Sequence, residues 1–554
     1  MTANLHRPAI APEPQRPGGP SPSPSRALVL AGGGMRVAYQ AGAVKALFDA
    51  GLRFEHADGA SGGTINLAAL MSGVAPDELC DRWRGLTVRD FAALRPARDY
   101  LHLGRIKAFG SAAGLADKVY PALGINIDRI RAAQGMQASF NVCRFDDKTL
   151  VAMPHTTLDL PRLVAAASLP IFMPAVLAEG CTWTDAVWIK DANLLACVQR
   201  GARELWLVWC IGNTPKYHDG PFRQYVHMIE ISAIGALNWE LATIADINRR
   251  IAAGETVMGH DQPITVHIIK PERPLPLDPD FFMGRIDAAT LIDMGYRDAR
   301  RALRQVEPAP LTPAATQMTE PGVGISFRET MQGTLVLDDI DPAAGTFALV
   351  GDVGDVDGLG RTGDADDEPV ALAKPIRLAL HATIHIADIQ AFVDDPQHRA
   401  DLTGHLDFAP FGQAVPAERG VFGLFCPAGD PAQVTMVYEL GVRHQGQDWW
   451  LAGKKRLHLG APWGLWRETT TLYVTLHHGA DASAPVAGAG VLCLGVAELL
   501  RLLATLHATE SPTAGDSAAA LWCFARFFGG ELWRIYGRRQ RLAGPYPPPG
   551  RPPT

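Results

Sequence analysis

The spacing of hydrophobic residues changes character near residue 310. Before it, short apolar runs alternate with segments of helical periodicity, and this pattern predicts an α/β architecture. The first run, residues 27–31, predicts a buried strand, and residues 36–50 predict a helix directly after it. We therefore expect an α/β domain over residues 26–310.

Beyond a join that contains Pro308, Pro310 and Pro313, alternation of period two dominates. Residues 378–386 place an apolar side chain at every second position, which predicts a half-buried strand. Residues 434–440 and 449–459, joined across Gly446, predict a β-hairpin, and helical spacing returns at residues 496–507 and 517–536. The second half is thus expected to be a β-rich α+β domain over residues 320–540.

Both ends of the chain are rich in proline. Seven prolines fall within the first 25 residues, and six more follow Gly544. Proline cannot donate a backbone hydrogen bond, and such segments bury too little apolar surface to fold. Residues 1–25 and 541–554 are therefore predicted to be disordered tails.

Composition narrows the range of functions. With 554 residues, 47% of them hydrophobic and 20% charged, the chain has the composition of a soluble multidomain protein. Its net charge of −7 argues against binding to nucleic acid. Eight cysteines without a CxxC pair favour reduced thiols in the cytoplasm over disulfides or a zinc site. No stretch reaches the roughly 20 apolar residues of a membrane span, so membrane contact is expected to be peripheral.

A candidate nucleophile stands at Ser61. Gly59-x-Ser61-x-Gly63 matches the nucleophile elbow, in which a serine occupies a sharp turn between a strand and a helix. The turn forces the backbone close to its neighbours, which small flanking residues tolerate best. Residues 62–72 have helical spacing, so the amides of the helix N-terminus are expected to face the serine and favour an oxyanion. Alone, the pattern also fits an ordinary Gly-rich turn.

A run of three glycines follows the first predicted strand. Gly32, Gly33 and Gly34 would let several backbone N–H groups converge on one anionic oxygen. The run is not a dinucleotide fingerprint, because Val37 stands where the third glycine is needed, and it lacks the Gly-Lys-Ser/Thr of a P-loop. An oxyanion loop and a plain tight turn are the two interpretations left.

Two aspartates compete for the role of a general base. Residues 175–178 and 181–184, turning at Glu179-Gly180, predict a small hairpin that ends on Asp185. A carboxylate beside a serine hydroxyl can accept its proton without a histidine. Asp191 is the competing candidate, and either carboxylate alone also fits a solvated or capping position.

In their order and context, these elements resemble the patatin-like phospholipases. Members of that family carry a G-G-G-x-[KR]-G loop, a G-x-S-x-G serine and a D-G-[GA] aspartate that pairs with the serine. Here the loop is GGGMR at residues 32–36, the serine is Ser61, and Asp185 fits the aspartate better than Asp191. Residues 140–142 and 167–174 are also similar to family sequence. The resemblance spans residues 26–210 and implies a central, mostly parallel sheet flanked by helices.

The resemblance implies a serine lipid acyl hydrolase. Asp185 would take the proton of Ser61, which would attack a lipid or other acyl ester, without a metal or cofactor. The substrate would be reached from the cytoplasm, at a peripheral membrane or lipid-droplet surface. Backbone groups of the loop and the elbow would hold the oxyanion, namely Gly32, Gly33, Gly34, Arg36 and Gly62.

The sequence departs from the family pattern at two places. Val37 replaces the glycine that closes the loop, and Ala186-Val187 replace the small pair after the aspartate. Neither change removes a group that performs chemistry, but both alter backbone freedom near the site. The two substitutions are therefore also consistent with reduced or redirected activity.

The C-terminal half resembles an accessory module of cholesterol-oxidase-like glucose-methanol-choline oxidoreductases. The resemblance rests on FRETMQG at 327–333, DDPQHRA at 394–400, ERGVFGLF at 418–425 and LWRETTTL at 465–472. The flavin fingerprint of those enzymes is missing, so no redox chemistry is expected. The resemblance implies a module that holds or presents lipid.

Two other functions compete with the hydrolase. A Ser-His-Asp α/β-hydrolase esterase would need a histidine downstream of the aspartate, and four are available: His218, His227, His260 and His267. The second is a catalytically silent lipid-binding or scaffolding protein that kept the fold.

Overall fold

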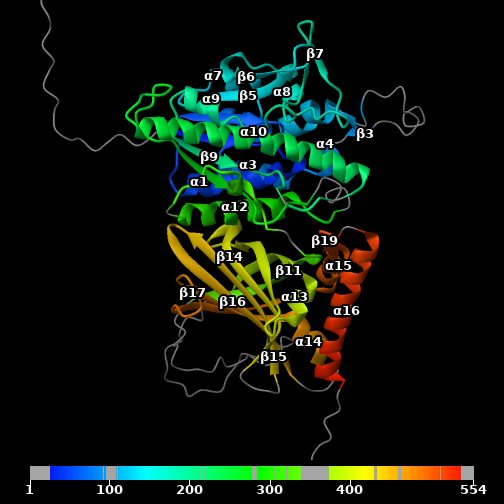
Figure 1. Ribbon diagram of the computed structural model, residues 1–554. Helices are drawn as coiled ribbons and strands as arrows, with labels where there is room; N and C mark the ends of the chain where they lie inside the picture. Colours follow the sequence, from blue (N-terminus) through cyan, green and yellow to red (C-terminus); the bar gives the residue numbers. More distant parts are fainter. Residues whose placement is uncertain are drawn as a thin grey trace, which may run out of the picture.

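The computed structural model describes residues 25–91, 93–94, 108, 110–213, 215–217, 219–276, 284–305, 307–319, 322–337, 374–428, 433–458, 464–511 and 513–537. Two domains lie one above the other, and helix α12 (Ala288–Arg304) lies between them (Figure 1). Apart from Ser25, the predicted tails at 1–25 and 541–554 fall outside the described residues.

The N-terminal domain is built on one sheet in which five strands run parallel. The parallel strands follow the order β10-β9-β1-β2-β5. Strands β6 and β8 pair antiparallel with β5, and β7 pairs antiparallel with β8. The expectation of a mostly parallel sheet is confirmed. The strands are β1 (Arg26–Leu30), β2 (His56–Ala60), β5 (Gln137–Arg144), β6 (Thr149–Pro154), β7 (Val176–Ala178), β8 (Cys181–Thr184), β9 (Glu204–Val208) and β10 (Thr265–Ile269).

Helices cover both faces of this sheet because successive side chains of β1 point in opposite directions. Leu28 and Leu30 join a core with α1 (Ala38–Asp49), α2 (Gly63–Met71), α3 (Pro76–Arg84) and α12. Ala27 and Val29 join the opposite core with α9 (Leu194–Gln199) and α10 (Pro221–Ala252). A strand buried on both sides reads as a continuous apolar run, as residues 27–31 do.

Shorter elements complete the domain. They are η1 (Gly34–Val37), α4 (Val88–Phe91), β3 (Ala93–Leu94), β4 (Gly110–Ser111), η3 (Leu115–Val119), α6 (Tyr120–Ala122), α7 (Ile127–Ala132), η4 (His155–Thr157) and α8 (Leu160–Ala166). The helix expected over 36–50 thus begins as the 3₁₀ turn η1, because the glycine loop leads into it. The hairpin before Asp185 forms as β7 and β8, with left-handed residues at Glu179 and Gly180.

Strands dominate the C-terminal domain, as its alternating pattern predicts. Eight antiparallel strands follow one another from β11 to β18, and β11 pairs with both β12 and β18, so the sheet closes on itself. The strands are β11 (Gly324–Leu337), β12 (Ile376–Ile386), β13 (Arg399–Phe408), β14 (Gly412–Pro427), β15 (Gln433–His444), β16 (Gln447–His458), β17 (Thr471–His478), β18 (Val486–Cys493) and β19 (His507–Thr509), which pairs with β11.

Apolar side chains fill the closed sheet. Helix α16 (Ala514–Tyr536) contributes Phe524 to this core, where its ring lies 6.2 Å from that of Phe327. The remaining described elements are η5 (Pro313–Thr316), α13 (Ile389–Asp394), α14 (Leu465–Thr470) and α15 (Val496–Thr505). None of the helices in the described ranges is long and apolar enough to cross a membrane.

Ion pairs fix the two domains to each other. On α12, Arg300 and Arg304 both contact Glu418 of β14, and Asp293 accepts a hydrogen bond from His405 of β13. Arg273, which follows β10, pairs with Asp401 at 2.7 Å. Because several of these groups are mostly buried, α12 serves as a shared platform for both domains.

Candidate active site

Ser61 lies on the turn between β2 and α2. Its φ angle is 47°, a left-handed conformation that costs a residue with a side chain on the order of 1–3 kcal/mol. The amide and hydroxyl of Thr64 both donate to the Ser61 carbonyl, at 3.0 and 2.6 Å, and so hold the turn. Ser61 therefore has the strained, buried placement that its sequence pattern predicts for an elbow.

The two glycines after Ser61 allow the elbow to approach β1 and the Gly-rich loop. A Cβ at Gly63 would lie 2.2 Å from the Leu30 carbonyl oxygen, and one at Gly62 would lie 2.8 Å from Cγ1 of Val37. Val37, the residue that departs from the family pattern, is fully buried. Its side chain therefore packs beneath the elbow.

Asp185 follows β8 and faces Ser61 directly. The Ser61 hydroxyl donates to Oδ2 of Asp185 at 2.6 Å, and the amide of Val187 donates to Oδ1 at 2.9 Å. Burial raises the pKa of Asp185 to about 7, against the hydrogen bonds from Ser61 and from the amides of Val187 and Ala186. Ala186 and Val187, the second place where the sequence departs from the family pattern, are buried. Their backbone amides orient the carboxylate of Asp185.

Asp191 is equally buried but bonds to the loop instead of the serine. Its Oδ2 accepts from the amide of Gly32 at 2.9 Å, and its Oδ1 has no partner among the described residues. Burial, and then the charge of Asp185, raise its pKa well above the usual range. A Cβ at Gly32 would lie 2.2 Å from Oδ1 of Asp191 and 2.7 Å from Cβ of Ser61, so these three residues are packed together.

The loop residues named as oxyanion donors have different surroundings. Gly32 already donates to Asp191, whereas the amides of Gly33, Gly34 and Gly62 donate to no group in the described part of the chain. The Arg36 amide and Nε both donate to the carbonyl of Gly33, at 3.1 and 3.0 Å, which folds the loop into η1. The oxyanion assignment of these residues stays a prediction.

Buried amide side chains connect the loop to the elbow helix. Nε2 of Gln40 donates to the Ala31 carbonyl at 2.5 Å, and Nδ2 of Asn66 donates to the Val37 carbonyl and to Gln40. Trp83 donates to Asn66 at 2.7 Å. Sequence analysis missed these residues, although a Gln and an Asn within otherwise apolar helices are the signal that could have found them.

A second buried network lies beneath the elbow. Asp58 of β2 accepts from Ser139 and from Asn141 of β5, both at 2.5 Å, and Asn141 also donates to the Gly59 carbonyl. Burial raises the pKa of Asp58 to about 7. These bonds join β5 to the end of β2 that leads into Ser61. They therefore hold the elbow at a fixed position relative to the sheet.

The histidines that a triad would need lie elsewhere. His227 contacts Glu230, His260 contacts the Val198 carbonyl, and His267 stacks on Trp206, while His218 falls outside the described residues. Within the described ranges, no histidine hydrogen-bonds to Ser61 or Asp185. The direct contact between Ser61 and Asp185 leaves no place for an imidazole between them.

One comparison with known proteins bears on the N-terminal domain. Residues 28–196 match the family model described as patatin-like phospholipase, which indicates a lipid acyl hydrolase. The matched segment contains the glycine loop, the elbow and both aspartates. A search of curated proteins found no match. The match ends in α9, and no comparison supports the expected resemblance of the C-terminal half to an oxidoreductase module.

Proposed function

We propose that the N-terminal domain is a serine lipid acyl hydrolase in which Ser61 is the nucleophile and Asp185 the general base. The observation that carries this proposal is the 2.6 Å hydrogen bond from the Ser61 hydroxyl to Asp185 on a left-handed turn. A base must lie within hydrogen-bond reach of the proton that it abstracts, and its pKa is best placed near the working pH. The raised pKa of Asp185, about 7, satisfies the second condition.

In the first half-reaction, Oγ of Ser61 attacks the ester carbonyl carbon and its proton moves to Oδ2 of Asp185. The oxyanion of the tetrahedral intermediate lies at the amides of Gly33, Gly34 and Gly62. When the intermediate collapses, Asp185 returns the proton to the departing alcohol and an acyl-serine remains. Water then loses a proton to Asp185 and attacks the acyl carbon, after which the proton returns to Ser61 and the carboxylic acid leaves.

Asp191 supports this cycle as a neutral carboxyl group. The charges of Asp185 and Asp191 repel each other if both groups are ionised, so only one takes up charge readily. The high pKa of Asp191 leaves the charge on Asp185. Asp191 meanwhile fixes the loop through the Gly32 amide. It is thus a positioning residue.

The substrate is proposed to be a lipid at an aggregated surface. Ile171, Phe172 and Leu177 are 51%, 38% and 75% exposed, and they lie on the segments that lead into Asp185. The backbone carbonyl of Ser168, a residue just before them in the sequence, accepts a hydrogen bond from the amide of Asp185. Figure 1 shows β7 at the end of the domain that faces away from the C-terminal domain. An apolar rim beside the site suits contact with lipid.

Changing Leu177 tests this rim. In Leu177→Asp, turnover of phospholipid vesicles should fall several-fold, whereas turnover of a short, soluble ester should stay within twofold of wild type. Met258→Asp is the matched control, since Met258 is 48% exposed and lies in the turn before β10, away in sequence from the segments that lead into Asp185. Equal loss on both substrates would contradict a surface role.

Hydrolysis of an acyl-ester panel tests the proposed activity itself. Wild type should release fatty acid from at least one lipid ester, Ser61→Ala should release none above background, and Ser72→Ala should match wild type. Ser72 is a suitable control because it is a buried serine at the far end of α2. A wild-type protein that hydrolyses no ester would favour the silent lipid-binding alternative.

A further inference from the structure

Three potential metal ligands lie together on the outer face of the closed sheet. His381 of β12 stands directly opposite His405 of β13, and Asp407 follows two positions later on the same face. One ligand atom from each side chain lies within 4.8 Å of the other two. All three residues are partly exposed, in contrast to Leu380 and Leu406, which point into the sheet.

In both imidazoles Nδ1 contacts a group outside the cluster, which assigns the ligand role to Nε2. Nδ1 of His405 lies 2.7 Å from a carboxylate oxygen of Asp293, and Nδ1 of His381 lies 3.3 Å from the Thr330 hydroxyl. Nε2 of His381 lies 3.2 Å from Oδ2 of Asp407. Metal-bound histidines commonly hold their second nitrogen in this way, because a carboxylate or hydroxyl partner orients the ring and raises its basicity.

Asp293 and Asp407 are themselves held in place. Oδ1 of Asp407 accepts the Ala414 amide at 2.7 Å, which leaves Oδ2 toward the histidines. Asp293 is 3% exposed, and its second oxygen has no partner among the described residues. Two carboxylates next to two imidazoles supply the charge that a divalent cation would neutralise.

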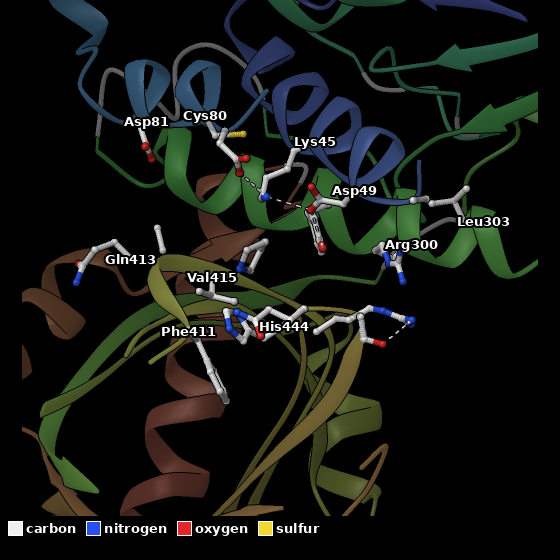
Figure 2. Close-up of a pocket in the computed structure, with 18 of the residues that line it drawn as sticks. Lys45, Asp49, Cys80, Asp81, Arg300, Leu303, Phe411, Gln413, Val415 and His444 are labelled. Carbon is white, nitrogen blue, oxygen red and sulfur yellow. Dashed lines mark hydrogen bonds and ion pairs between the residues drawn. The ribbon is translucent and has the colours of Figure 1, made fainter. Parts of the chain in front are cut away.

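The cavity between the domains comes near the cluster at Ala414. This cavity measures about 1020 Å³, and Ala414, the residue that bonds Asp407, is part of its wall. Figure 2 shows its upper wall, with Lys45 and Asp49 on α1 and Arg300 on α12, facing Gln413, Val415 and His444 of the C-terminal domain. The side chains of His381 and Asp407 are 31% and 32% exposed, so an aqueous ion can reach them.

We propose that His381, His405 and Asp407 bind a divalent first-row transition-metal ion, with Zn²⁺ as the best match. Imidazole and carboxylate ligands suit Zn²⁺, which takes four ligands at about 2.0–2.2 Å, so water would complete the set. The ligand atoms, now within 4.8 Å of one another, must close by up to about 1.4 Å to reach the spacing of roughly 3.4 Å that such bonds impose. The rings of His381 and His405 stack with their centroids 4.6 Å apart, so one ring must also turn for both nitrogens to point at the ion. The bound ion would link β12 and β13 and, through Asp293, the platform helix α12.

Metal titration of the chelator-treated, full-length protein tests this proposal. Co²⁺ added alone should give visible d–d absorption that saturates at one ion per chain, and Zn²⁺ should displace it. Asp407→Asn and His381→Ala should lose at least 100-fold in Zn²⁺ affinity. Asp293→Asn should lose about 10–100-fold, as is typical when the partner of a metal-bound histidine is removed. His385→Ala, four residues along the same strand, should bind as wild type does.

Two results would overturn the metal site: wild-type protein that takes up no Co²⁺ or Zn²⁺ at micromolar concentration, or undiminished binding in both His381→Ala and Asp407→Asn. Far-UV circular dichroism checks that the variants fold. Zn²⁺ should also raise the Tm of wild type and not that of Asp407→Asn, since a ligand that binds only the folded state stabilises it. Neither metal binding nor the Tm depends on ester hydrolysis. The metal site and the proposed hydrolase activity are therefore tested independently.

Discussion

Among the buried carboxyl groups, Asp185 of the N-terminal domain and Glu329 of the C-terminal domain have opposite surroundings. In the closed sheet, Glu329 of β11 bonds to Nζ of Lys455 and to the Tyr438 hydroxyl, both at 2.7 Å. Asp185 in the N-terminal domain has only a serine hydroxyl and backbone amides as partners. Glu329 is thus part of a buried ion pair, whereas Asp185, which has no cation beside it, has a raised pKa and can accept a proton.

This difference separates structural from reactive carboxyl groups within one chain. Both carboxyl groups are buried, so burial alone does not distinguish them. Glu329 joins β11 to the opposite side of the closed sheet, since Tyr438 and Lys455 belong to β15 and β16. The carboxylate of Asp185 bonds only to Ser61 and to the backbone amides of the two residues that follow it. The comparison leads to three predictions.

Replacing Asp185 should have the largest effect on activity. Asp185→Asn keeps the shape of the side chain but removes the base, so kcat/KM on esters should fall by about 10²–10⁴-fold. Because the variant also removes a poorly solvated charge, its free energy of unfolding near neutral pH should equal or exceed that of wild type. Steady-state kinetics and urea denaturation measure the two quantities. Loss of activity through unfolding would contradict the account.

Replacing Glu329 should lower the stability of the protein and leave its activity unchanged. Glu329→Gln leaves Lys455 buried without a counter-charge, which should lower the free energy of unfolding by about 3–5 kcal/mol. Ester hydrolysis per folded molecule should not change. The double variant Glu329→Gln/Lys455→Met should recover most of the stability, because it removes the stranded charge. Urea denaturation of the three variants checks this, and a loss of activity without a loss of stability would contradict it.

The pH dependence of the free energy of unfolding should show the smallest of the three effects. The folded-state pKa of Asp185, about 7, lies above its ordinary value of 3.8, so ionisation of this group disfavours the folded state. The cost is absent below about pH 4, grows as pH rises, and is complete above about pH 7. The stability of Asp185→Asn relative to wild type should therefore increase over that window. A difference that is constant with pH would contradict the raised pKa.

Local sequence patterns were enough to predict the main parts of the candidate site. The elbow at Ser61 and the hairpin before Asp185 depend on turn chemistry and short-range alternation, and both form where expected. The bond between Gly32 and Asp191 could not be predicted, because it joins residues 159 positions apart through packing of the whole domain. The role of Asp185 as the partner of Ser61 still awaits an experiment.

In the C-terminal domain the sequence predicted strands but not their partners. Alternation assigns Leu380 to the inside and His381 to the outside, yet it does not say which strand lies beside β12. The pairing of β11 with both β12 and β18 closes the sheet and brings Thr330, His381 and His405 into one row. Glu329 occupies an inward position of β11 next to Met331, a conflict with binary patterning that only its distant partner Lys455 resolves.

The central claim is that Ser61 is a nucleophile activated by Asp185. The most direct test is reaction of the intact protein with a fluorophosphonate, followed by mass spectrometry of the adduct and its peptides. The account predicts one adduct per chain on Ser61, strongly slowed in Asp185→Asn and unchanged in Ser72→Ala and Glu329→Gln. An unlabelled Ser61 in folded wild-type protein, or labelling at full rate in Asp185→Asn, would contradict it.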